Sequence, residues 1–253
     1  MRFSDIFRLD DIWKALSLLS RLPCPPADWN SDRPAARSAW AYPLAGLLVA
    51  ALAASLGAAV TWLGGPAGVT AGFVLIAMAM MTGAMHEDGL ADCADGFWGG
   101  WDRSRRLDIM RDSRIGTYGV LALVFSGLIR WAALTALINA GSLFAGLIAS
   151  ALLSRAAMVA VMAWLPFARE DGLAHDTGRP GMETAAAATG LGLCGALALL
   201  GTPALAVGLG VAVTMVMVGL LASRKIGGQT GDVLGATQNS AEVVALSLCV
   251  ALI

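Results

Sequence analysis

The chain contains long stretches in which charged positions disappear. No Asp, Glu, Lys or Arg occurs in the 48 residues 38–85 or in the 40 residues 184–223. A helix needs about 20 apolar residues to cross a bilayer core of about 30 Å, so each stretch is long enough for two membrane spans. Turn-forming residues divide them, at Gly64–Pro66 and at Gly201–Pro203. The pattern therefore predicts two pairs of membrane-spanning helices.

Two further regions extend this pattern. Residues 116–165 form a third pair that divides around Asn139–Gly141, with Arg130 inside one member and Arg155 inside the other. Residues 233–253 are long enough for a last span, which contains Glu242. We therefore predict an all-α polytopic membrane protein with about seven transmembrane helices, folded as a single integral membrane catalytic domain over residues 1–253.

The N-terminal residues show an amphipathic pattern. Residues 4–20 place most of their apolar side chains on one helical face, with Arg8, Asp11 and Lys14 elsewhere. This pattern predicts an interfacial helix lying flat at the membrane surface, with a helix packed on the rest of the protein as the alternative. The apolar face consists of Ile6, Phe7, Ile12, Trp13, Leu16 and Leu19.

Composition and charge fit a membrane protein. Hydrophobic residues make up 57% of the chain and charged residues 14%, with a mean hydropathy of +0.71. Disorder and an ordinary soluble domain are thus excluded, and the net charge of −1 gives no field to attract nucleic acid. Of the 17 basic residues, 15 precede the first span or lie in alternate connections. By the positive-inside rule, the N-terminus (residues 1–37) and the segment 86–116 face the cytoplasm.

The segment 86–116 opens with an acidic cluster. Asp88, Asp92 and Asp95 are spaced i, i+4, i+7, so a helix places their carboxylates on one face, with Glu87 to the side. Three like charges at this spacing repel unless a cation lies among them, and carboxylates with phosphate oxygens are typical Mg²⁺ ligands. The alternative is a solvated acidic face. His86 is a candidate base or ligand, or a hydrogen-bonded structural residue.

Arginines and glycines follow this cluster. Arg111 and Arg114 precede Gly116, and arginine forks and glycine-rich helix starts both suit phosphate oxygens. A charge inside an apolar helix costs roughly 2.5–3.5 kcal/mol, so Arg130 and Arg155 are expected to face a functional cavity and bind anions. A buried ion pair or snorkelling toward the interface remains the alternative. From the residues alone, we predict a membrane phosphotransferase that uses Mg²⁺.

Asp232 belongs to a second glycine-rich segment, residues 225–236, immediately before the last span. Such a segment is able to form a phosphate-binding turn, or to be a flexible linker that ends in an Asp N-cap. Asp232 is therefore a candidate further metal ligand or substrate contact.

A resemblance to the cobalamin synthase family, also called adenosylcobinamide-GDP ribazoletransferases, runs through three segments: HEDGLADCADGFWGG (86–100), RLDIMRDSRIGTYG (106–119) and GDVLGATQNSAE (231–242). Residues 20–23 and 42–46 are similar to that family's N-terminal motifs, with Ser20 where the family has Thr. The resemblance implies a Mg²⁺-dependent inner-membrane transferase whose active site faces the cytoplasm. The acidic motif is also similar to that of CDP-alcohol phosphotransferases.

The activity implied is the last assembly step of vitamin B12. The adenosylcobinamide-phosphate moiety of adenosylcobinamide-GDP is transferred to the 5′-hydroxyl of α-ribazole, or to α-ribazole 5′-phosphate, with release of GMP. The roles expected are Mg²⁺ binding by Asp88, Asp92 and Asp95 with Glu87 beside them, and proton removal by one of these carboxylates or by His86. Phosphate binding is expected from Arg111, Arg114, Arg130 and Arg155. Gly116 and Asp232 are expected to bind substrate as well, with Asp232 as an additional metal ligand or a ribose contact.

Partners and alternative functions follow from the same features. The expected partners are the two substrates and the lipid bilayer, with a homo-oligomer and other enzymes of the cobalamin pathway left open. A transporter of a corrinoid or a phosphorylated metabolite would explain charges inside the spans. Transporters commonly show inverted repeats with sites near the midplane, whereas these acidic residues gather toward one membrane face.

Overall fold

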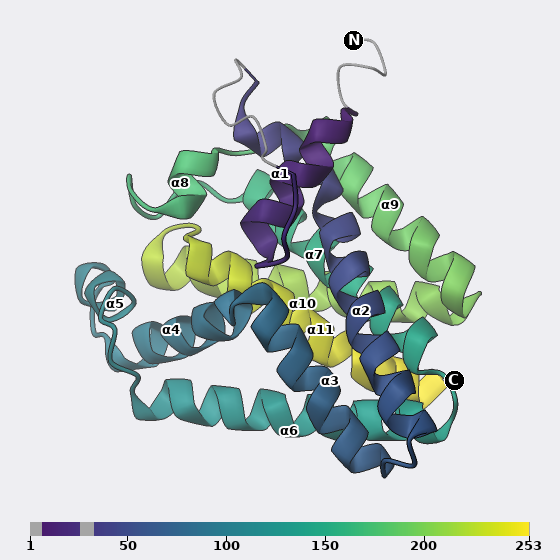
Figure 1. Cartoon of the computed structure of the whole chain (residues 1–253). Coiled ribbons are helices and arrows are strands. Elements are labelled where there is room, and N and C mark those ends of the chain that lie inside the picture. Colours follow the sequence, from purple (N-terminus) through teal and green to yellow (C-terminus); the bar gives the residue numbers. More distant parts are fainter. Residues whose placement is uncertain (1–6, 26–32, 253) are drawn as a thin grey trace.

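The chain folds into helices joined by short connections. The computed structural model describes residues 7–25 and 33–252, so Ile6 and Ile253 lie outside the described residues. Within these ranges the extended pairing is one isolated β-bridge, between Phe167 and Gln229. The α-helices, labelled in Figure 1, are α1 (Leu9–Leu19), α2 (Tyr42–Trp62), α3 (Ala67–Thr82), α4 (Met85–Gly99), α5 (Arg103–Ile109), α6 (Thr117–Asn139), α7 (Leu143–Trp164), α8 (Leu173–Thr177), α9 (Met182–Leu200), α10 (Pro203–Ile226) and α11 (Gly231–Leu252). A 3₁₀ helix, η2 (Ala35–Ala41), directly precedes α2.

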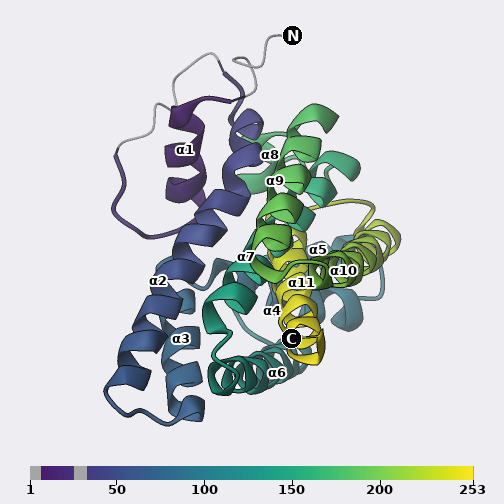
Figure 2. The same cartoon turned by 90° about the vertical axis from the view of Figure 1, so that its right-hand side faces the viewer.

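The long helices form two groups that cross. In Figure 2, α2, α3, α7 and α9 run up the page, whereas α6 and α11 are seen nearly end-on. Helices α7 and α11 lie at the centre of the bundle. In their most apolar stretches, 78% and 67% of the residues are buried, whereas the corresponding share in the other candidate spans is 22–39%. Outer helices expose large apolar side chains, such as Phe125 on α6 and Leu209 on α10. A bilayer would cover these side chains, so the protein is an integral membrane protein.

The predicted spans are confirmed with one modification. In the described part of the chain, six helices are long and apolar enough to cross a membrane: α2 extended by η2, α6, α7, α9, α10 and α11. The predicted second span is a helix of only 16 residues, α3, which reaches spanning length only together with α4 across a bend of 88°. The bend lies at Gly83 and Ala84, whose φ angles of 64° and 56° are left-handed and cannot continue a helix.

The N-terminal helix packs on the rest of the protein. α1 contacts η2 and α2, and the side chains of Asp11 and Lys14, assigned to the polar side of an interfacial helix, are 1% and 3% exposed. Asp11 accepts hydrogen bonds from Trp40 Nε1 at 2.8 Å and from Arg33 Nη2 at 2.8 Å. The expected polar face is therefore wrong for these two residues, because tertiary partners that the local pattern does not reveal cover them. Leu9 and Trp13 are exposed.

The bend before α4 lets this helix lie against α11. A Cβ added at Gly89 of α4 would lie 2.7 Å from the carbonyl oxygen of Asp232, and one at Gly235 of α11 would lie 3.1 Å from that of Met85. The first distance is too short for a Cβ atom and the second is tighter than most real Cβ contacts, so glycine at these positions allows the two backbones to approach. This crossing brings the acidic residues of α4 next to the N-terminus of α11.

Candidate active site

Helix α4 presents its acidic residues in several directions. At about 100° per residue, His86, Glu87 and Asp88 point three different ways, while Asp92 and Asp95 return toward the direction of Asp88. The helix predicted for this segment is confirmed. Each direction meets a different part of the bundle, and the surroundings decide what each carboxylate can do.

His86 points into the protein, roughly half a turn from Asp88 and Asp95. Its side chain is 3% exposed and lines a cavity of about 50 Å³ together with apolar residues that include Tyr42 and Met158. Within the described residues, Nε2 has no hydrogen-bond partner. The structure therefore places His86 apart from the aspartates with which the sequence analysis grouped it.

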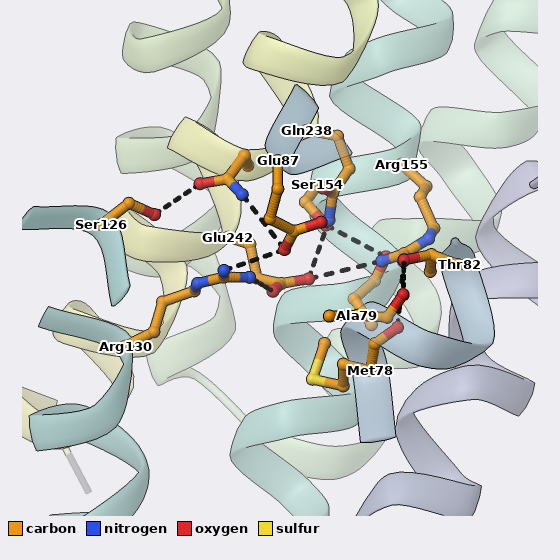
Figure 3. A network of polar contacts seen from close by, with 12 residues as sticks. Met78, Ala79, Thr82, Glu87, Ser126, Arg130, Ser154, Arg155, Gln238 and Glu242 are labelled. Atoms are coloured by element: carbon orange, nitrogen blue, oxygen red, sulfur yellow. Dashed lines mark hydrogen bonds and ion pairs between the residues drawn. The ribbon is translucent and has the colours of Figure 1, made fainter. Parts of the chain in front are cut away.

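Glu87 belongs to a buried chain of ion pairs that joins four helices (Figure 3). Arg130 of α6 donates from Nη2 to Glu87 Oε1 at 2.9 Å and from Nη1 to Glu242 Oε1 at 3.2 Å. Arg155 of α7 donates from Nη1 to Glu242 Oε2 at 3.4 Å. Glu242 of α11 is 1% exposed and lies between the two arginines. The four charges sum to zero, so each buried charge has an opposite partner that offsets part of the cost of removing it from water.

Amide and hydroxyl groups complete this network. Gln238 donates from Nε2 to Glu242 Oε2 at 2.8 Å and to Ser154 Oγ at 3.2 Å. Ser126 donates to Asn239 Oδ1 at 2.6 Å, and Asn239 Nδ2 lies 3.5 Å from Glu87 Oε1.

Both arginines inside the membrane helices thus have carboxylate partners, which is the alternative that the sequence analysis left open. Binding of phosphate by Arg130 or Arg155 stays a prediction, and in this structure it would compete with Glu87 and Glu242.

Asp95 binds the N-terminus of α6. Its Oδ2 accepts a hydrogen bond from the backbone N–H of Gly116 at 2.7 Å, and its Oδ1 accepts one from Gly119 at 2.9 Å. A carboxylate is stabilised there because the first N–H groups of a helix lack intrahelical partners and carry partial positive charge. A Cβ at Gly116 would lie 2.5 Å from Oδ1, and one at Gly119 would overlap the carboxylate. Gly116 thus holds the acidic motif of α4 against the start of α6, and its contact with substrate stays a prediction.

Asp92 lies at the centre of a carboxylate cluster. It is half-buried and experiences the charges of Asp88, Asp95 and Asp232, together with the opposite charge of Arg169. Asp232, at the N-terminus of α11, lies 3.6 Å from Arg169 Nη2 and accepts a hydrogen bond from the Thr230 hydroxyl at 3.1 Å. The structure thus brings the predicted Asp88, Asp92 and Asp232 together through the crossing of α4 and α11.

The residue types in this cluster fit a Mg²⁺ ion, since carboxylate oxygens are its preferred protein ligands. The cluster also carries more negative than positive charge, because Arg169 is the one cation that acts on Asp92 among the described residues. No three His, Cys, Asp or Glu side chains of residues 7–25 and 33–252 already stand close enough to share one ion. Asp88, Asp92 and Asp232 therefore offer the right donors but have to converge further to hold a metal.

The arginines of the segment before α6 lie at the surface. Arg111 pairs with Asp171 at 2.7 Å, and Arg114 pairs with Asp112 at 2.8 Å while its side chain is 88% exposed. Hydrogen bonds from Arg114 lower the pKa of Asp112 and raise the pKa of Arg114. Arg114 also borders an open cleft of about 450 Å³ with Asp95 and Gly116. The predicted phosphate binders of this segment are thus accessible, and both already have a carboxylate partner.

Several polar residues of the site were not predicted from the sequence. Arg169 lies in a connection to which no motif was assigned, and its place beside Asp232 depends on the fold. Gln238 and Asn239 were quoted within a motif but given no role, although two amides beside Glu242 in an apolar span are a signal of a buried polar network.

The fold and the site define a polytopic helical membrane protein with a buried ion network and a carboxylate cluster at one helix crossing. Residues 11–250 match the family model described as cobalamin-5-phosphate synthase. The chain is 42% identical to the adenosylcobinamide-GDP ribazoletransferase of Mesorhizobium japonicum over 94% of its own length and 92% of the relative's. It is 43% identical to the proteins of the same name from Sinorhizobium medicae and Brucella ovis, again over 94% of this chain and 94% and 95% of theirs.

The chain belongs to the cobalamin-5-phosphate synthase family. No solved structure matches it.

The contact between Asp95 and α6 can be tested on a single helix. We expect Gly119→Ala to push the Asp95 carboxylate off the N-terminus of α6 and to lower the thermal midpoint of the purified protein in detergent. Gly127→Ala is the matched control, because a Cβ there meets open space on the same helix and alanine favours a helix over glycine by roughly 0.5–1 kcal/mol. Equal midpoints for the two variants would contradict this assignment.

The buried network makes a second prediction. Glu242→Gln leaves the charges of Arg130 and Arg155 without their shared carboxylate, which costs about 3–5 kcal/mol for a buried ion pair. We expect a large fall in the thermal midpoint, whereas Glu170→Gln, at an exposed position, should leave it unchanged. A Glu242→Gln protein with the thermal midpoint of the wild type would show that the ion-pair network does not stabilise the fold to this extent.

Proposed function

We propose that this chain transfers the adenosylcobinamide-phosphate group of adenosylcobinamide-GDP to α-ribazole or α-ribazole 5′-phosphate and releases GMP, in the last assembly step of vitamin B12. Identities of 42–43% to relatives named adenosylcobinamide-GDP ribazoletransferase, over nearly the whole chain, support this activity. The single structural observation that carries the proposal is the carboxylate cluster around Asp92, at the crossing of α4 and α11.

The reaction exchanges one phosphorus–oxygen bond for another. A ribose hydroxyl oxygen of the acceptor bonds to the phosphorus next to cobinamide, the bond from that phosphorus to the GMP oxygen breaks, and GMP leaves with the electron pair. The hydroxyl proton passes to an α4 carboxylate. The attacking group expected from the sequence is the 5′-hydroxyl of α-ribazole. Because α-ribazole 5′-phosphate has no free 5′-hydroxyl, an attacking group common to both acceptors has to be another ribose hydroxyl.

The chain's own residues have distinct tasks in this proposal. Asp88, Asp92 and Asp232 would hold Mg²⁺, which neutralises charge on the diphosphate and on the leaving oxygen. Asp95 keeps α4 against the N-terminus of α6 and so fixes the position of Asp92. Glu87 binds Arg130 through Oε1 and so ties α4 to α6, and its role as a metal ligand stays a prediction. Fixed donors and carboxylates of this kind lower the barrier because they need no rearrangement during the reaction.

We place the site at the cytoplasmic face of the inner membrane. The basic residues of the N-terminal segment and of the connections beside the cluster support this orientation under the positive-inside rule. The corrinoid substrate and the lipid bilayer are the partners that this placement requires.

The proposal is tested by GMP release from the purified protein. We expect release when both substrates and Mg²⁺ are supplied, none with EDTA, and a fall of roughly 100-fold or more for Asp92→Asn, comparable to removal of a key electrostatic group from an active site. Asp108→Asn, on the exposed side of α5, is the matched control and should retain wild-type activity.

Both variants should elute from size exclusion like the wild type. Substantial activity of Asp92→Asn at saturating Mg²⁺ would reject the cluster as the active site, and a wild-type protein that releases no GMP would reject the proposed activity.

A further inference from the structure

The connection between α7 and α8 holds Arg169 in a fixed place. The backbone pairs with the connection between α10 and α11: Ala168 N–H donates to Gln229 O at 2.8 Å, and Gln229 N–H donates to Pro166 O at 2.8 Å. The buried Gln229 side chain also donates from Nε2 to the carbonyls of Met162 and Leu165, both at 2.8 Å. The residue before Arg169 is thus fixed by hydrogen bonds to a segment that leads directly into Asp232.

The guanidinium of Arg169 lies among carboxylates, but its N–H groups form few hydrogen bonds with them. The side chain is 17% exposed, with Nη2 3.6 Å from Asp232 Oδ2 and Nε 3.5 Å from Asp171 Oδ1. Both Nε and Nη1 are buried and have no hydrogen-bond partner among the described residues. Asp171 already binds Arg111 at 2.7 Å, so Arg169 is not its main partner.

Among the described residues, Arg106 and Arg130 each leave one buried nitrogen, Nε, without a hydrogen-bond partner, whereas Arg169 leaves two. Arg130 and Arg155 bind Glu242, and Arg103 donates from Nε to the Ile226 carbonyl at 2.7 Å. A buried N–H without an acceptor costs free energy, and the planar guanidinium is best satisfied by two oxygens of one oxyanion. Arg169 therefore has two unused, buried donors directly beside the carboxylates of Asp92 and Asp232.

We propose that Arg169 binds non-bridging phosphate oxygens of the diphosphate in the nucleotide-activated substrate. This inference rests on the proposed function, because the ligand is the diphosphate that reacts there. Nε–H and Nη1–H of Arg169 point to different edges of the guanidinium, so each would donate to a different oxygen of the diphosphate. Arg169 thereby supplies the positive charge that the surrounding carboxylates otherwise lack, and its planar fork fixes the orientation of the diphosphate.

Two binding measurements separate this role from a purely structural one. We expect Arg169→Gln to weaken GDP binding in saturating Mg²⁺ by at least about 10-fold, the loss typical of one hydrogen bond to a charged group. Binding of Mg²⁺ alone, titrated without nucleotide, should be unchanged or tighter, because a positive charge has left the cluster. Arg169→Lys keeps the charge but loses the fork, so GDP binding should fall by less than in Arg169→Gln.

Arg179→Gln is the matched control. Arg179 lies in the next connection, between α8 and α9, where it donates to the carbonyl of Ala163 at 2.7 Å. Its variant should bind GDP and Mg²⁺ like the wild type. In turnover, Arg169→Gln should raise KM for adenosylcobinamide-GDP and leave KM for α-ribazole unchanged.

Three results would overturn the inference. GDP binding by Arg169→Gln equal to the wild type shows that Arg169 does not contact the diphosphate. Parallel loss of GDP and Mg²⁺ binding shows that it only positions Asp232. Displacement of GDP from the wild type by phosphatidylglycerol micelles assigns the donors to a lipid headgroup. If Arg169→Gln cannot be purified, unchanged GDP binding by Arg169→Lys rejects the inference equally.

Failure of this inference and failure of the proposed function give different results. Wild-type GMP release tests the activity itself, so a wild type that releases GMP while Arg169→Gln binds GDP normally would reject this inference alone. A wild type that releases no GMP would reject the proposed function, whatever the Arg169 variants bind.

Discussion

Arg130 and Arg155 lie inside the membrane bundle, where their positive charges need carboxylate partners. The rest of the structure depends on the ion pairs that they form. Glu242 lies between Arg130 and Arg155 and binds both, so one carboxylate joins α11 to α6 and α7, which lie much earlier in the sequence. Glu87 adds α4 to the same network through Arg130. An unpaired charge in this environment is costly. The pairing thus fixes how α4, α6, α7 and α11 meet.

The position of the carboxylate cluster is a consequence of this arrangement. α4 is held at one point by Glu87 and at another by Asp95, which binds the N-terminus of α6. Between these two points, Gly89 allows the backbone of α4 to touch α11, and this contact brings Asp232 beside Asp92. Buried polar groups therefore position the half-buried Asp92, so the network that stabilises the bundle also shapes the site.

Much of the fold could be predicted from the sequence, because membrane spans are recorded locally as long uncharged stretches. The break at Gly83 and Ala84 could not, since it falls inside such a stretch and depends on two left-handed residues. For the site, the spacing of the aspartates located the acidic helix. It did not reveal that Asp95 binds a helix N-terminus or that Arg169 lies beside Asp232, because both contacts join segments distant in the sequence.

The most direct test of this account is an experimental structure of the protein with Mg²⁺ and adenosylcobinamide-GDP bound, in a form that does not turn over because the acceptor is absent. The account predicts density for an ion in contact with Asp92 and Asp232, with the diphosphate between this ion and Arg169. An ion or a diphosphate bound elsewhere, with these side chains directed into solvent, would contradict it.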